Sequence, residues 1–555
     1  MGLNYQVNIS KRVVNILLCT IFLSFFSCQQ TPTRQADYDI IIYGGTSGGI
    51  AAAIQGSRMG KKVLLLEPSS RLGGLTTGGL GQTDIGNKIA IGGIAREFYQ
   101  NIKAYYENPS NWKWEKKTDY KSGGQSKTDE GEDAMWTFEP SVALKVYDQM
   151  IAAENFDLVS GKRLMMNGGV IKSNNEITEI TMEDGTKYSG LMFIDATYEG
   201  DLMAASGVSY TVGREANSLY GETFNGVQLM EGHQFPDGID PYIVSGNPES
   251  GLLWGISSDT LMPEGSGDKL VQAYNFRICL TDNPENRIPI TRPDNYDSTR
   301  YELLVRLFEA QPQKRKLNDF FIWSMMPNRK TDINNKGAFS TDMIGENYDF
   351  PEASWQKRKE IQKKHEDYTK GLLYFYTSDP RVPEELKSAM QQWGYPKDEY
   401  TESGNWSPQL YVREARRLVG AYVMNQANCV GEEVVKESIG LAAYTMDSHN
   451  CQRIVVDGQV KNEGNVEKGG FPPYPIAYRS ILPKKEEATN LLVPTCLSAS
   501  HIAFGSIRME PVFMILGQSA TIAAVLALEE GVDLHELSYE KFEKELLNVK
   551  QKLAL

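Results

Sequence analysis

Two of the five histidines in this chain, His449 and His501, lie in segments where a histidine could transfer protons. His449 belongs to the loop 447–450 (DSHN), and His501 precedes a long apolar segment near the C-terminus. Imidazole titrates near neutral pH and is the side chain most often used for general acid–base catalysis. We predict His449 and His501 as catalytic candidates, with a structural role as the alternative for each. His365, in a charged segment, and His535, in the C-terminal tail, are expected to face solvent.

Three arginines and a glutamate cluster in residues 411–429, a segment that we expect to be a helix. On a helix Arg413 and Arg417 would share one face, because residues four apart are neighbours. Arginines placed in this way can clamp a carboxylate or the hydroxyl groups of a sugar. A surface helix whose arginines pair with Glu414 is the alternative. Arg416 is the third catalytic candidate.

The elements that would position a cofactor are concentrated in residues 38–67. Residues 39–43 (DIIIY) form a short apolar run typical of a buried parallel strand. The Ala-rich residues 50–59 predict a helix, and residues 63–66 (VLLL) predict a second buried strand. Strand, glycine turn, helix and strand in this order are typical of a dinucleotide-binding βαβ unit.

The turn between the first strand and the helix consists of small residues. In the spacing G-x-G-x-x-G the three fixed positions hold Gly44, Thr46 and Gly49, with threonine at the centre. A pyrophosphate would bind at the helix N-terminus, where free N–H groups and the helix dipole favour anions. Glu67 would accept hydrogen bonds from a ribose. A βαβ unit that binds no nucleotide is the alternative. The predicted contacts are Gly44, Gly45, Thr46, Ser47, Gly48, Gly49 and Glu67.

The residues after Glu67 indicate which dinucleotide is bound. The run 71–74 (RLGG) resembles the motif after the ribose-binding acid in FAD proteins of the glutathione-reductase-like superfamily. There a C-terminal segment closes the FAD site, and residues 505–531 resemble it, with an ordinary Ala-rich core helix as the alternative. The superfamily also places an Ala-Thr or Ala-Ser pair near the cofactor diphosphate. The resemblance implies FAD contacts from Pro68, Arg71, Gly73, Gly74, Leu164, Ala196, Thr197, Arg508, Glu510, Gly517 and Gln518.

Nearly the whole chain after the N-terminal segment resembles the bacterial FAD-dependent oxidoreductase family, whose members are often labelled FAD-dependent oxidoreductase or putative xanthan lyase. Thr46 at the central glycine position also occurs in that family. The resemblance implies that His449 and His501 approach the reactive ring of the flavin. The matching stretches are YGGTSGGIAAA (43–53), RLGGLTTGGLG (71–81), FIDATYEGDLMAASG (193–207), QAYNFRICLTDNPENRIPI (272–290), PNRKTDINNKGAFSTDMIGENYDFPEA (327–353), QLYVREARRLVG (409–420), MDSHNCQR (446–453) and SASHIAFGSIRMEP (498–511).

We predict an α/β fold, with a Rossmann-like FAD-binding domain that has a parallel sheet and an inserted α+β substrate domain. Within the insertion we expect strands over residues 253–290 and a helix over residues 353–374. The predicted division is 1-27, lipoprotein signal peptide; 28-37, tether; 38-215, first part of the FAD-binding domain; 216-435, inserted substrate or cap domain; 436-530, second part of the FAD-binding domain; and 531-555, C-terminal helical tail.

The N-terminus has the pattern of an export signal. Lys11 and Arg12 precede an apolar stretch, residues 13–26, that is too short to span a bilayer comfortably. The following Ser-Cys pair resembles the end of a lipobox, so we predict cleavage before Cys28 and lipidation of this cysteine. An uncleaved anchor helix is the alternative. The protein is then expected in the cell envelope, on the periplasmic or outer-membrane face, with membrane contact only through the lipid.

The formal net charge of −14 argues against nucleic acid and anionic lipid surfaces as partners. The cysteines show no spacing for zinc or for the iron–sulfur clusters that the heterodisulfide reductase relatives of the family carry, and no metal site is predicted. Cys429 and Cys451 could form a disulfide in an oxidising compartment, although buried free thiols are the favoured alternative.

We therefore expect an FAD-dependent oxidoreductase that transfers a hydride between FAD and a small organic substrate. Export, aromatic content and polar loops favour a sugar or glycan fragment as that substrate. The alternatives are a polysaccharide lyase and a non-catalytic glycan-binding lipoprotein that retains FAD. The electron acceptor is not assigned, although no second nucleotide fingerprint is evident, which favours oxygen, a quinone or a protein over NAD(P)H.

Overall fold

The computed structural model describes residues 1–2 and 36–555. The predicted signal peptide and the predicted lipid site Cys28 lie outside the described residues, as does nearly all of the predicted tether. Residues 37–555 form one compact unit. The domain boundaries predicted inside this unit, at 215, 435 and 530, stay predictions.

A seven-stranded sheet forms the centre of the cofactor-binding half. Its parallel part has the order β3 (Asp157–Ser160), β2 (Val63–Glu67), β1 (Tyr38–Tyr43) and β6 (Lys187–Asp195). The last four residues of β1 and all of β2 are buried. Both strands are near-continuous apolar runs, as expected for strands covered on both faces. The predicted α/β fold with a parallel sheet is confirmed.

Two other parts of the chain complete this sheet. β19 (Leu491–Leu492) pairs in parallel with β6, so the C-terminal part of the chain returns to the same sheet. The N-terminal part of β6 pairs in antiparallel fashion with β5 (Glu176–Thr181), which in turn pairs with β4 (Val170–Ser173). The sheet is therefore parallel at the strand ends that face the predicted cofactor and antiparallel at one edge.

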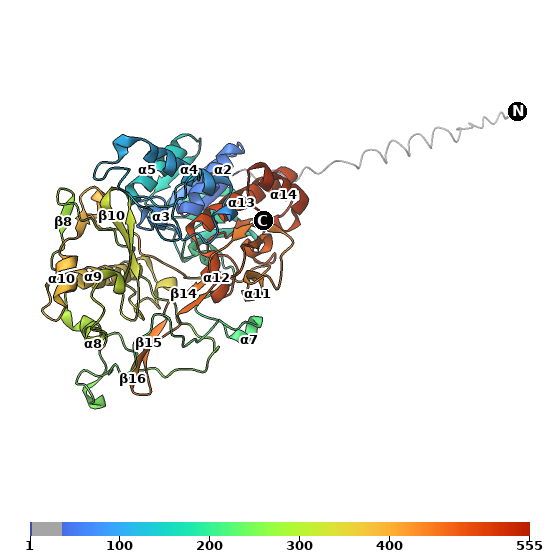
Figure 1. Ribbon diagram of the computed structural model, residues 1–555. Helices are drawn as coiled ribbons and strands as arrows, with labels where there is room; N and C mark the ends of the chain where they lie inside the picture. The colour runs from blue at the N-terminus through green and yellow to red at the C-terminus, as the bar shows by residue number, and fades with distance from the viewer. Residues whose placement is uncertain (3–35) are drawn as a thin grey trace. The chain divides into compact units, whose positions relative to one another are not determined.

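Helix α2 (Ser47–Arg58) connects β1 to β2, so the predicted βαβ unit is confirmed to within three residues at each element end. Helix α13 (Glu510–Glu530) packs across α2 (Figure 1). A Cβ atom on Gly48 would lie 2.8 Å from the carbonyl oxygen of Phe513, and one on Gly517 would overlap the carbonyl oxygen of Gly48. The two backbones approach so closely that both positions require glycine.

Helix α13 is apolar on all sides because it lies in the core, in contact with α2, α4 (Gly93–Glu107) and α14 (Tyr539–Asn548). It is long and apolar enough to cross a membrane by length and composition, but 94% of its most apolar window is buried in the protein. An all-apolar helix in these surroundings is a core helix. Figure 1 shows α2, α4, α13 and α14 gathered in one lobe with the C-terminus.

Much of the region between residues 216 and 435 lies in a second lobe in Figure 1, which also contains the later strands β15 (Gln452–Val456) and β16 (Gln459–Glu463). It contains the hairpin β9 (Phe321–Met326) and β10 (Lys330–Asn335), followed by the 24-residue helix α9 (Trp355–Ser378). The helix predicted over 353–374 is confirmed. The strands expected over 253–290 are mostly wrong, because β8 (Arg287–Pro289) is the only strand assigned there and the rest forms isolated bridges.

The helix predicted over residues 411–429 is also wrong. The segment is extended, with β12 (Arg417–Leu418), and only α11 (Gln426–Cys429) is helical. Each arginine finds its partner on a different part of the protein, and these buried contacts override helix propensity. His365 is likewise fully buried within α9 rather than solvated, because the lysines around it cover only the outer face of that helix.

The remaining elements surround these two lobes. The other helices are α3 (Gly74–Thr77), α5 (Pro140–Ala152), α6 (Asp201–Ala205), α7 (Asn217–Tyr220), α8 (Glu302–Ala310), α10 (Glu384–Met390) and α12 (His501–Ile507). The other strands are β7 (Tyr210–Thr211), β11 (Gly394–Pro396), β13 (Ser438–Ala442), β14 (Met446–Ser448), β15 (Gln452–Val456), β16 (Gln459–Glu463), β17 (Val466–Lys468) and β18 (Tyr474–Ala477).

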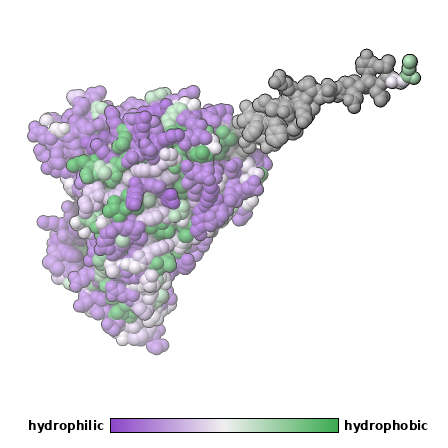
Figure 2. Space-filling view, turned by 90° about the vertical axis from the view of Figure 1, so that its right-hand side faces the viewer, coloured by the Kyte–Doolittle hydropathy of each residue, from purple (hydrophilic) through white to green (hydrophobic). Residues whose placement is uncertain are grey.

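The face of the protein shown in Figure 2 is mainly hydrophilic, with small hydrophobic patches scattered over it. The cysteines of the described chain, Cys279, Cys429, Cys451 and Cys496, are all buried and free. The buried-thiol alternative is therefore the one that the structure supports for Cys429 and Cys451.

Candidate functional site

A cavity of about 200 Å³ opens where the parallel strands end. Gly44 follows β1, Glu67 ends β2 and Thr197 follows β6 by two residues, and all three line this cavity. In open α/β sheets a ligand binds outside the carboxyl ends of the strands, where neighbouring connections leave in different directions. We call this space the dinucleotide cavity.

The glycine turn is fixed against the end of β6. Gly44 has a φ of 107°, and a Cβ atom there would lie 2.8 Å from the backbone of Ala196. The hydroxyl of Thr46 donates a 2.7 Å hydrogen bond to the carbonyl of Ala196 and accepts one from the N–H of Gly49, capping α2. Ser47 has a buried hydroxyl without a hydrogen-bond partner in the described structure. The N-terminus of α2 thus presents free donors to an anion.

Glu67 lies between the glycine turn and the cavity. Its two carboxylate oxygens accept hydrogen bonds from the N–H of Gly45 at 2.7 Å and of Ser69 at 2.6 Å. Burial raises the pKa of Glu67, against the lowering effect of these hydrogen bonds. Each carboxylate oxygen can accept more than one hydrogen bond, so Glu67 keeps acceptor capacity for a ribose.

The RLGG motif brings the backbone close to the same cavity. Gly74 has a φ of 52°, and a side chain there would overlap the hydroxyl of Tyr198. The N–H of Gly73 donates to the carbonyl of Gly45 at 2.7 Å. Arg71 lines the cavity, donates to the carbonyl of Thr77 at 2.9 and 3.2 Å, and forms an ion pair at its tip.

Other predicted cofactor contacts are placed differently. Pro68 lines the cavity. Leu164 lies beside it, but its N–H donates to the Tyr43 hydroxyl and its carbonyl accepts from the Trp355 indole. Gln518 is not among the described residues that line the cavity, and its side-chain amide bonds to other buried amides. Gly517 serves the packing of α13 against α2.

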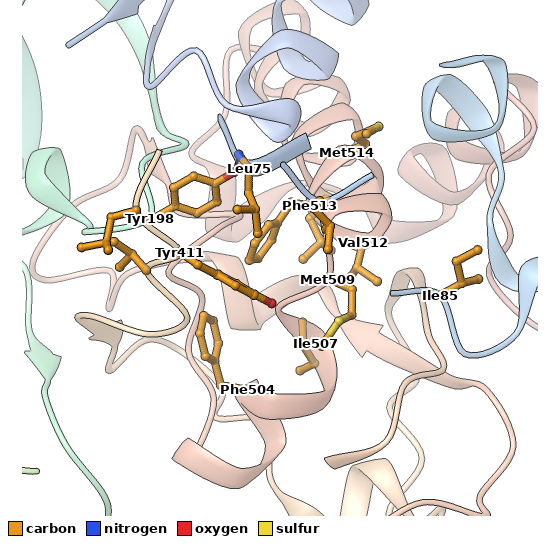
Figure 3. Packing of buried hydrophobic residues seen from close by; sticks show 14 of the residues in the cluster. Leu75, Ile85, Tyr198, Tyr411, Phe504, Ile507, Met509, Val512, Phe513 and Met514 are labelled. Carbon is orange, nitrogen blue, oxygen red and sulfur yellow. Dashed lines mark hydrogen bonds between the residues drawn. The ribbon is translucent and has the colours of Figure 1, made fainter. Parts of the chain in front are cut away.

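Glu510 stands at the start of α13, between the cavity and an apolar layer. Its carboxylate accepts hydrogen bonds of 2.7 Å from the hydroxyls of Tyr198 and Thr76. Burial raises its pKa. Figure 3 shows the apolar layer itself, in which Tyr411 lies among side chains of α12 and α13. The layer includes Leu75, Tyr198, Tyr411, Phe504, Ile507, Met509, Val512 and Phe513, all buried in one cluster.

Next to this layer is a closed network of charged and polar side chains that we call the polar ring. It connects four separate segments of the chain, and nearly all of its members are buried. Its members are Asp342, Tyr411, Arg413, Asp447, His449 and Arg508.

One half of the polar ring is centred on His449. Its Nδ1 lies 2.7 Å from Oδ2 of Asp342, and its Nε2 lies 3.6 Å from Oδ2 of Asp447. The first distance is a hydrogen bond and the second is too long for one. The Asp447 carboxylate accepts instead from Nη2 of Arg508 at 3.1 Å.

The other half is centred on Tyr411. Its hydroxyl accepts a 3.0 Å hydrogen bond from Arg508, and the guanidinium of Arg413 lies 4.5 Å from the centre of its ring. Nη2 of Arg413 lies 3.1 Å from Oδ1 of Asp342, which closes the ring. These last two atoms form an ion pair but are not aligned for a hydrogen bond.

The charges of the polar ring stabilise one another. Burial alone would raise the pKa of Asp342, but Arg413 and His449 more than offset this, and the pKa is lowered. The pKa of Asp447 is likewise lowered, because His449, Arg508 and Arg413 outweigh its burial. Burial lowers the pKa of Arg413, with Asp342 acting in the opposite direction. Both carboxylates therefore stay ionised at neutral pH.

Several buried polar atoms in and around the ring have no hydrogen-bond partner within the described chain. The donors are Nε and Nη2 of Arg413 and Nε of Arg508, and the acceptors include Oδ1 of Asp342. Oδ1 of Asn275 is another such acceptor, and the backbone of Asn275 is bonded to that of Tyr411. Buried polar groups are normally paired, so a bound ligand or ordered water would satisfy these atoms.

His501 lies behind the ring rather than in it. Its Nδ1 is 2.7 Å from the Glu414 carboxylate, and its Nε2 is 2.9 Å from the hydroxyl of Ser448, which neighbours His449. Burial would raise the pKa of Glu414, but His501 and Arg417 lower it to about 2. His501 is thus held in a buried position by Glu414 and by Ser448, the residue before His449.

Arg416 does not join either histidine. It donates to the carbonyl of Glu199 at 3.1 Å and to the Asp201 carboxylate at 2.9 Å, beside the dinucleotide cavity. The arginine of this segment that reaches the polar ring is Arg413, three residues earlier. The sequence places Asp447 beside His449, but it offers no signal that brings Asp342 to the same place.

The fold and the two sites define an α/β flavoprotein. The glycine cradle, the ribose acid and the unpaired hydroxyl at the start of α2 fit the diphosphate and ribose of FAD, and the apolar layer fits its ring system. A family model described as FAD dependent oxidoreductase matches residues 39–546. The chain belongs to this family, and it is an FAD-dependent enzyme.

Solved structures resemble parts of the chain. THI4 from Thermovibrio ammonificans is 13% identical over 38% of this chain and 76% of its own, with a TM-score of 0.22. OxyS anhydrotetracycline hydroxylase from Streptomyces rimosus is 11% identical over 41% and 43%, with a TM-score of 0.23. Thioredoxin reductase from Lactococcus lactis is 16% identical over 28% and 34%, with a TM-score of 0.16. The comparison with curated protein sequences gave no significant match.

Proposed function

We propose that this enzyme uses FAD to oxidise a hydroxyl-bearing carbon of a small neutral polyol, a sugar or glycan fragment, bound in the polar ring. The observation that carries this proposal is the mixture of unpaired donors and acceptors there. Arg413 and Arg508 supply the donors, and Asp342 and Asn275 supply the acceptors. A sugar hydroxyl both donates and accepts hydrogen bonds, so neighbouring hydroxyls can satisfy both kinds of group.

An anionic substrate fits this arrangement less well. A carboxylate only accepts hydrogen bonds, and its recognition usually relies on an arginine whose charge is not already paired. Here Arg413 faces Asp342 and Arg508 faces Asp447, at 3.1 Å in each case. The ring therefore has little net charge to attract an anion, which supports a neutral substrate.

In the proposed mechanism His449 is the general base. Asp342 accepts the Nδ1 proton of His449, so the neutral imidazole carries its free lone pair on Nε2. That nitrogen lies 3.6 Å from the Asp447 carboxylate, too far for a hydrogen bond, and can receive the proton of a substrate hydroxyl. The charge of Asp342 stabilises the imidazolium that forms. FAD, when bound, accepts the hydride from the carbon that bears this hydroxyl.

The entry to this site lies on the side of Asp447. Side chains of the ring are mostly buried, but the Asp447 side chain is 19% exposed and that of His449 is 11% exposed. Substrate would therefore reach the Nε2 side of His449 first. The surrounding apolar layer keeps water from the buried side of the ring, which strengthens its charged contacts.

The decisive experiment is anaerobic mixing of the yellow protein with neutral sugars, glycosides, 2-hydroxy acids and amino acids while the flavin spectrum is recorded. We expect one or more neutral sugars to bleach the flavin. Bleaching by acids alone would overturn the proposed substrate class. Formation of an unsaturated sugar without bleaching would indicate a polysaccharide lyase, and tight oligosaccharide binding without any flavin change would indicate a non-catalytic glycan-binding protein.

We also propose that the protein is a lipoprotein of the cell envelope. Support comes from the basic residues Lys11 and Arg12, the apolar residues 13–26 and the position of Cys28 two residues after them. In this setting oxygen, a quinone or a protein would serve as electron acceptor. The test is mass spectrometry of the N-terminal peptide together with a C28S variant, which should lose the lipid and leave the membrane fraction. An unmodified Cys28 in native protein would contradict this proposal.

A further inference from the structure

One face of helix α9 forms a wall of the dinucleotide cavity, although α9 lies in the sequence more than 280 residues after β2. Trp355, Arg358, Lys359 and Gln362 all line the cavity. Their spacing of three, four and seven residues places them on one side of the helix. The opposite wall carries Glu67 and the glycine turn, so α9 faces the ribose and diphosphate end of the site.

Trp355 attaches this helix to the strand that carries the glycine turn. Its indole N–H donates a 3.1 Å hydrogen bond to the carbonyl of Leu164, and the N–H of Leu164 donates a 2.8 Å bond to the hydroxyl of Tyr43, the last residue of β1. The guanidinium groups of Arg163 and Arg358 lie 5.6 and 5.2 Å from the centre of the indole ring. The ring is therefore held in place from several directions.

Arg358 provides the second attachment. Its guanidinium forms a bidentate contact with the carboxylate of Asp201, at 2.7 and 2.8 Å, and donates to the carbonyls of Phe350 and Pro351. Arg358 and Asp201 are both buried. Bidentate arginine–carboxylate pairs of this kind are geometrically specific and are costly to break when buried. Asp201 opens α6, six residues after the end of β6, so α9 is joined both to β1 through Leu164 and to the helix that follows β6.

Lys359 differs from these residues because its charge is not used by the protein. It is exposed at the rim of the cavity, and no ion pair is formed by it in the described part of the chain. A lysine at this place is a point charge within reach of an anionic ligand. The diphosphate of a dinucleotide is such a ligand.

We infer that α9 is a cap over the adenosine diphosphate end of FAD, in which Trp355 holds the cap closed and Lys359 attracts the diphosphate. The cavity volume of about 200 Å³ agrees with a closed cap, because ligand sites are usually roughly 300–1,000 Å³. FAD can then enter and leave only when α9 moves away from Leu164 and Asp201. The inserted region thereby controls how firmly the cofactor is retained, independently of which substrate the enzyme uses.

The test compares FAD release and FAD affinity in single variants of the whole protein. The release rate is measured after dilution, as the increase in the fluorescence of free flavin. W355A should release FAD at least about tenfold faster, since a hydrogen bond and the ring packing are both lost. W355F keeps the ring but not the indole N–H, and should show about a fivefold effect. Thermal unfolding of each variant shows whether the fold itself has changed.

K359Q should weaken FAD binding about threefold and make the affinity less sensitive to salt, because one cation at the diphosphate is lost. K357Q is the matched control, since Lys357 is also exposed on α9 but does not line the cavity. Release rates and affinities within twofold of wild type for both W355A and K359Q would overturn the inference. Because K359Q changes only an exposed side chain, it remains informative even if W355A fails to fold.

Discussion

The dinucleotide cavity and the polar ring belong to one compact unit but differ in the chemical groups that form them. The glycine turn of the cavity is formed by backbone groups and short side chains, such as Gly44 and the Thr46 hydroxyl, within one continuous βαβ unit, although α9 adds a wall of long side chains. The ring is formed by long charged side chains from four segments between Asp342 and Arg508. Backbone N–H donors remain after most amino-acid substitutions, whereas a single substitution can remove any one side chain of the ring. Cofactor binding can therefore stay constant while substrate recognition changes.

The carboxylates in the two regions also behave in opposite ways. Burial raises the pKa of Glu67 and of Glu510 beside the cavity, where few cations oppose it. In the ring the arginines and His449 outweigh burial, so the pKa values of Asp342 and Asp447 are lowered. The acids of the ring are therefore ionised and balanced by its arginines at neutral pH, whereas the acids of the cavity respond to small changes in their surroundings.

The largest expected effect is a loss of turnover without a loss of FAD binding. H449Q should lower kcat by about 10²–10⁴, because the proposed general base is lost, while the protein stays yellow and binds FAD as before. Stopped-flow bleaching with the substrate found by the screen measures this. H535Q is the matched control, since His535 lies in the C-terminal tail and bonds only to the carbonyl of Pro483. An H449Q enzyme with nearly wild-type turnover would remove His449 from the mechanism.

The next effect concerns stability at acid pH. The folded-state pKa of Glu414, about 2, lies below its unfolded value, so its contribution is present above pH ~4.5 and is lost as the pH falls toward 2. The contribution is on the order of 3 kcal/mol. Urea unfolding at pH 7 and at pH 3 should show this loss in wild type and a smaller pH dependence in E414Q. Equal pH dependence in the two proteins would show that Glu414 is not paired as described.

A smaller effect is expected from the ribose acid. E67Q should weaken FAD binding about tenfold, because a charged acceptor facing the ribose and two backbone N–H groups becomes a neutral amide. With saturating FAD the reaction rate should return to that of wild type, since Glu67 does not touch the polar ring. Fluorescence titration of apoprotein with FAD measures the affinity. Loss of turnover at full flavin occupancy would mean that the two regions are not separable.

The smallest effect is a pH dependence of cofactor binding. Burial and the carboxylates of Asp201 and Glu67 raise the pKa of Glu199 to about 7, against the lowering effect of Arg358. Glu199 lines the cavity and becomes negative above this pH, so it should repel the diphosphate. We expect FAD affinity to fall about threefold between pH 6 and pH 8. E199Q should abolish that fall, and an unchanged profile in E199Q would assign it to another group.

The glycine turn and the ribose acid of the cavity could be predicted from the sequence because they are local, whereas the wall formed by α9 could not. The strand ending at Tyr43, the turn of Gly44 to Gly49 and the acid Glu67 lie within 30 residues, and chain direction alone brings them together. The polar ring could be predicted only in part. His449 was recognised, but Asp342 reaches it over 107 residues through contacts that no local pattern encodes. The sequence predicts a helix in which Arg416 is the catalytic candidate, but tertiary ion pairs impose an extended chain, and Arg413 reaches the ring instead.

The glycine contact between α2 and α13 also sets the order in which the protein can mature. The carbonyl of Ala52 accepts a hydrogen bond from the hydroxyl of Thr521, 469 residues later. Until the ribosome has passed residue 521, helix α2 has no native partner on this face, however early its own turns form. The βαβ unit is thus synthesised early, but its packing is completed only when the C-terminal helix has been made. Contacts between residues so far apart form slowly, and the apolar surface of α2 stays exposed during synthesis.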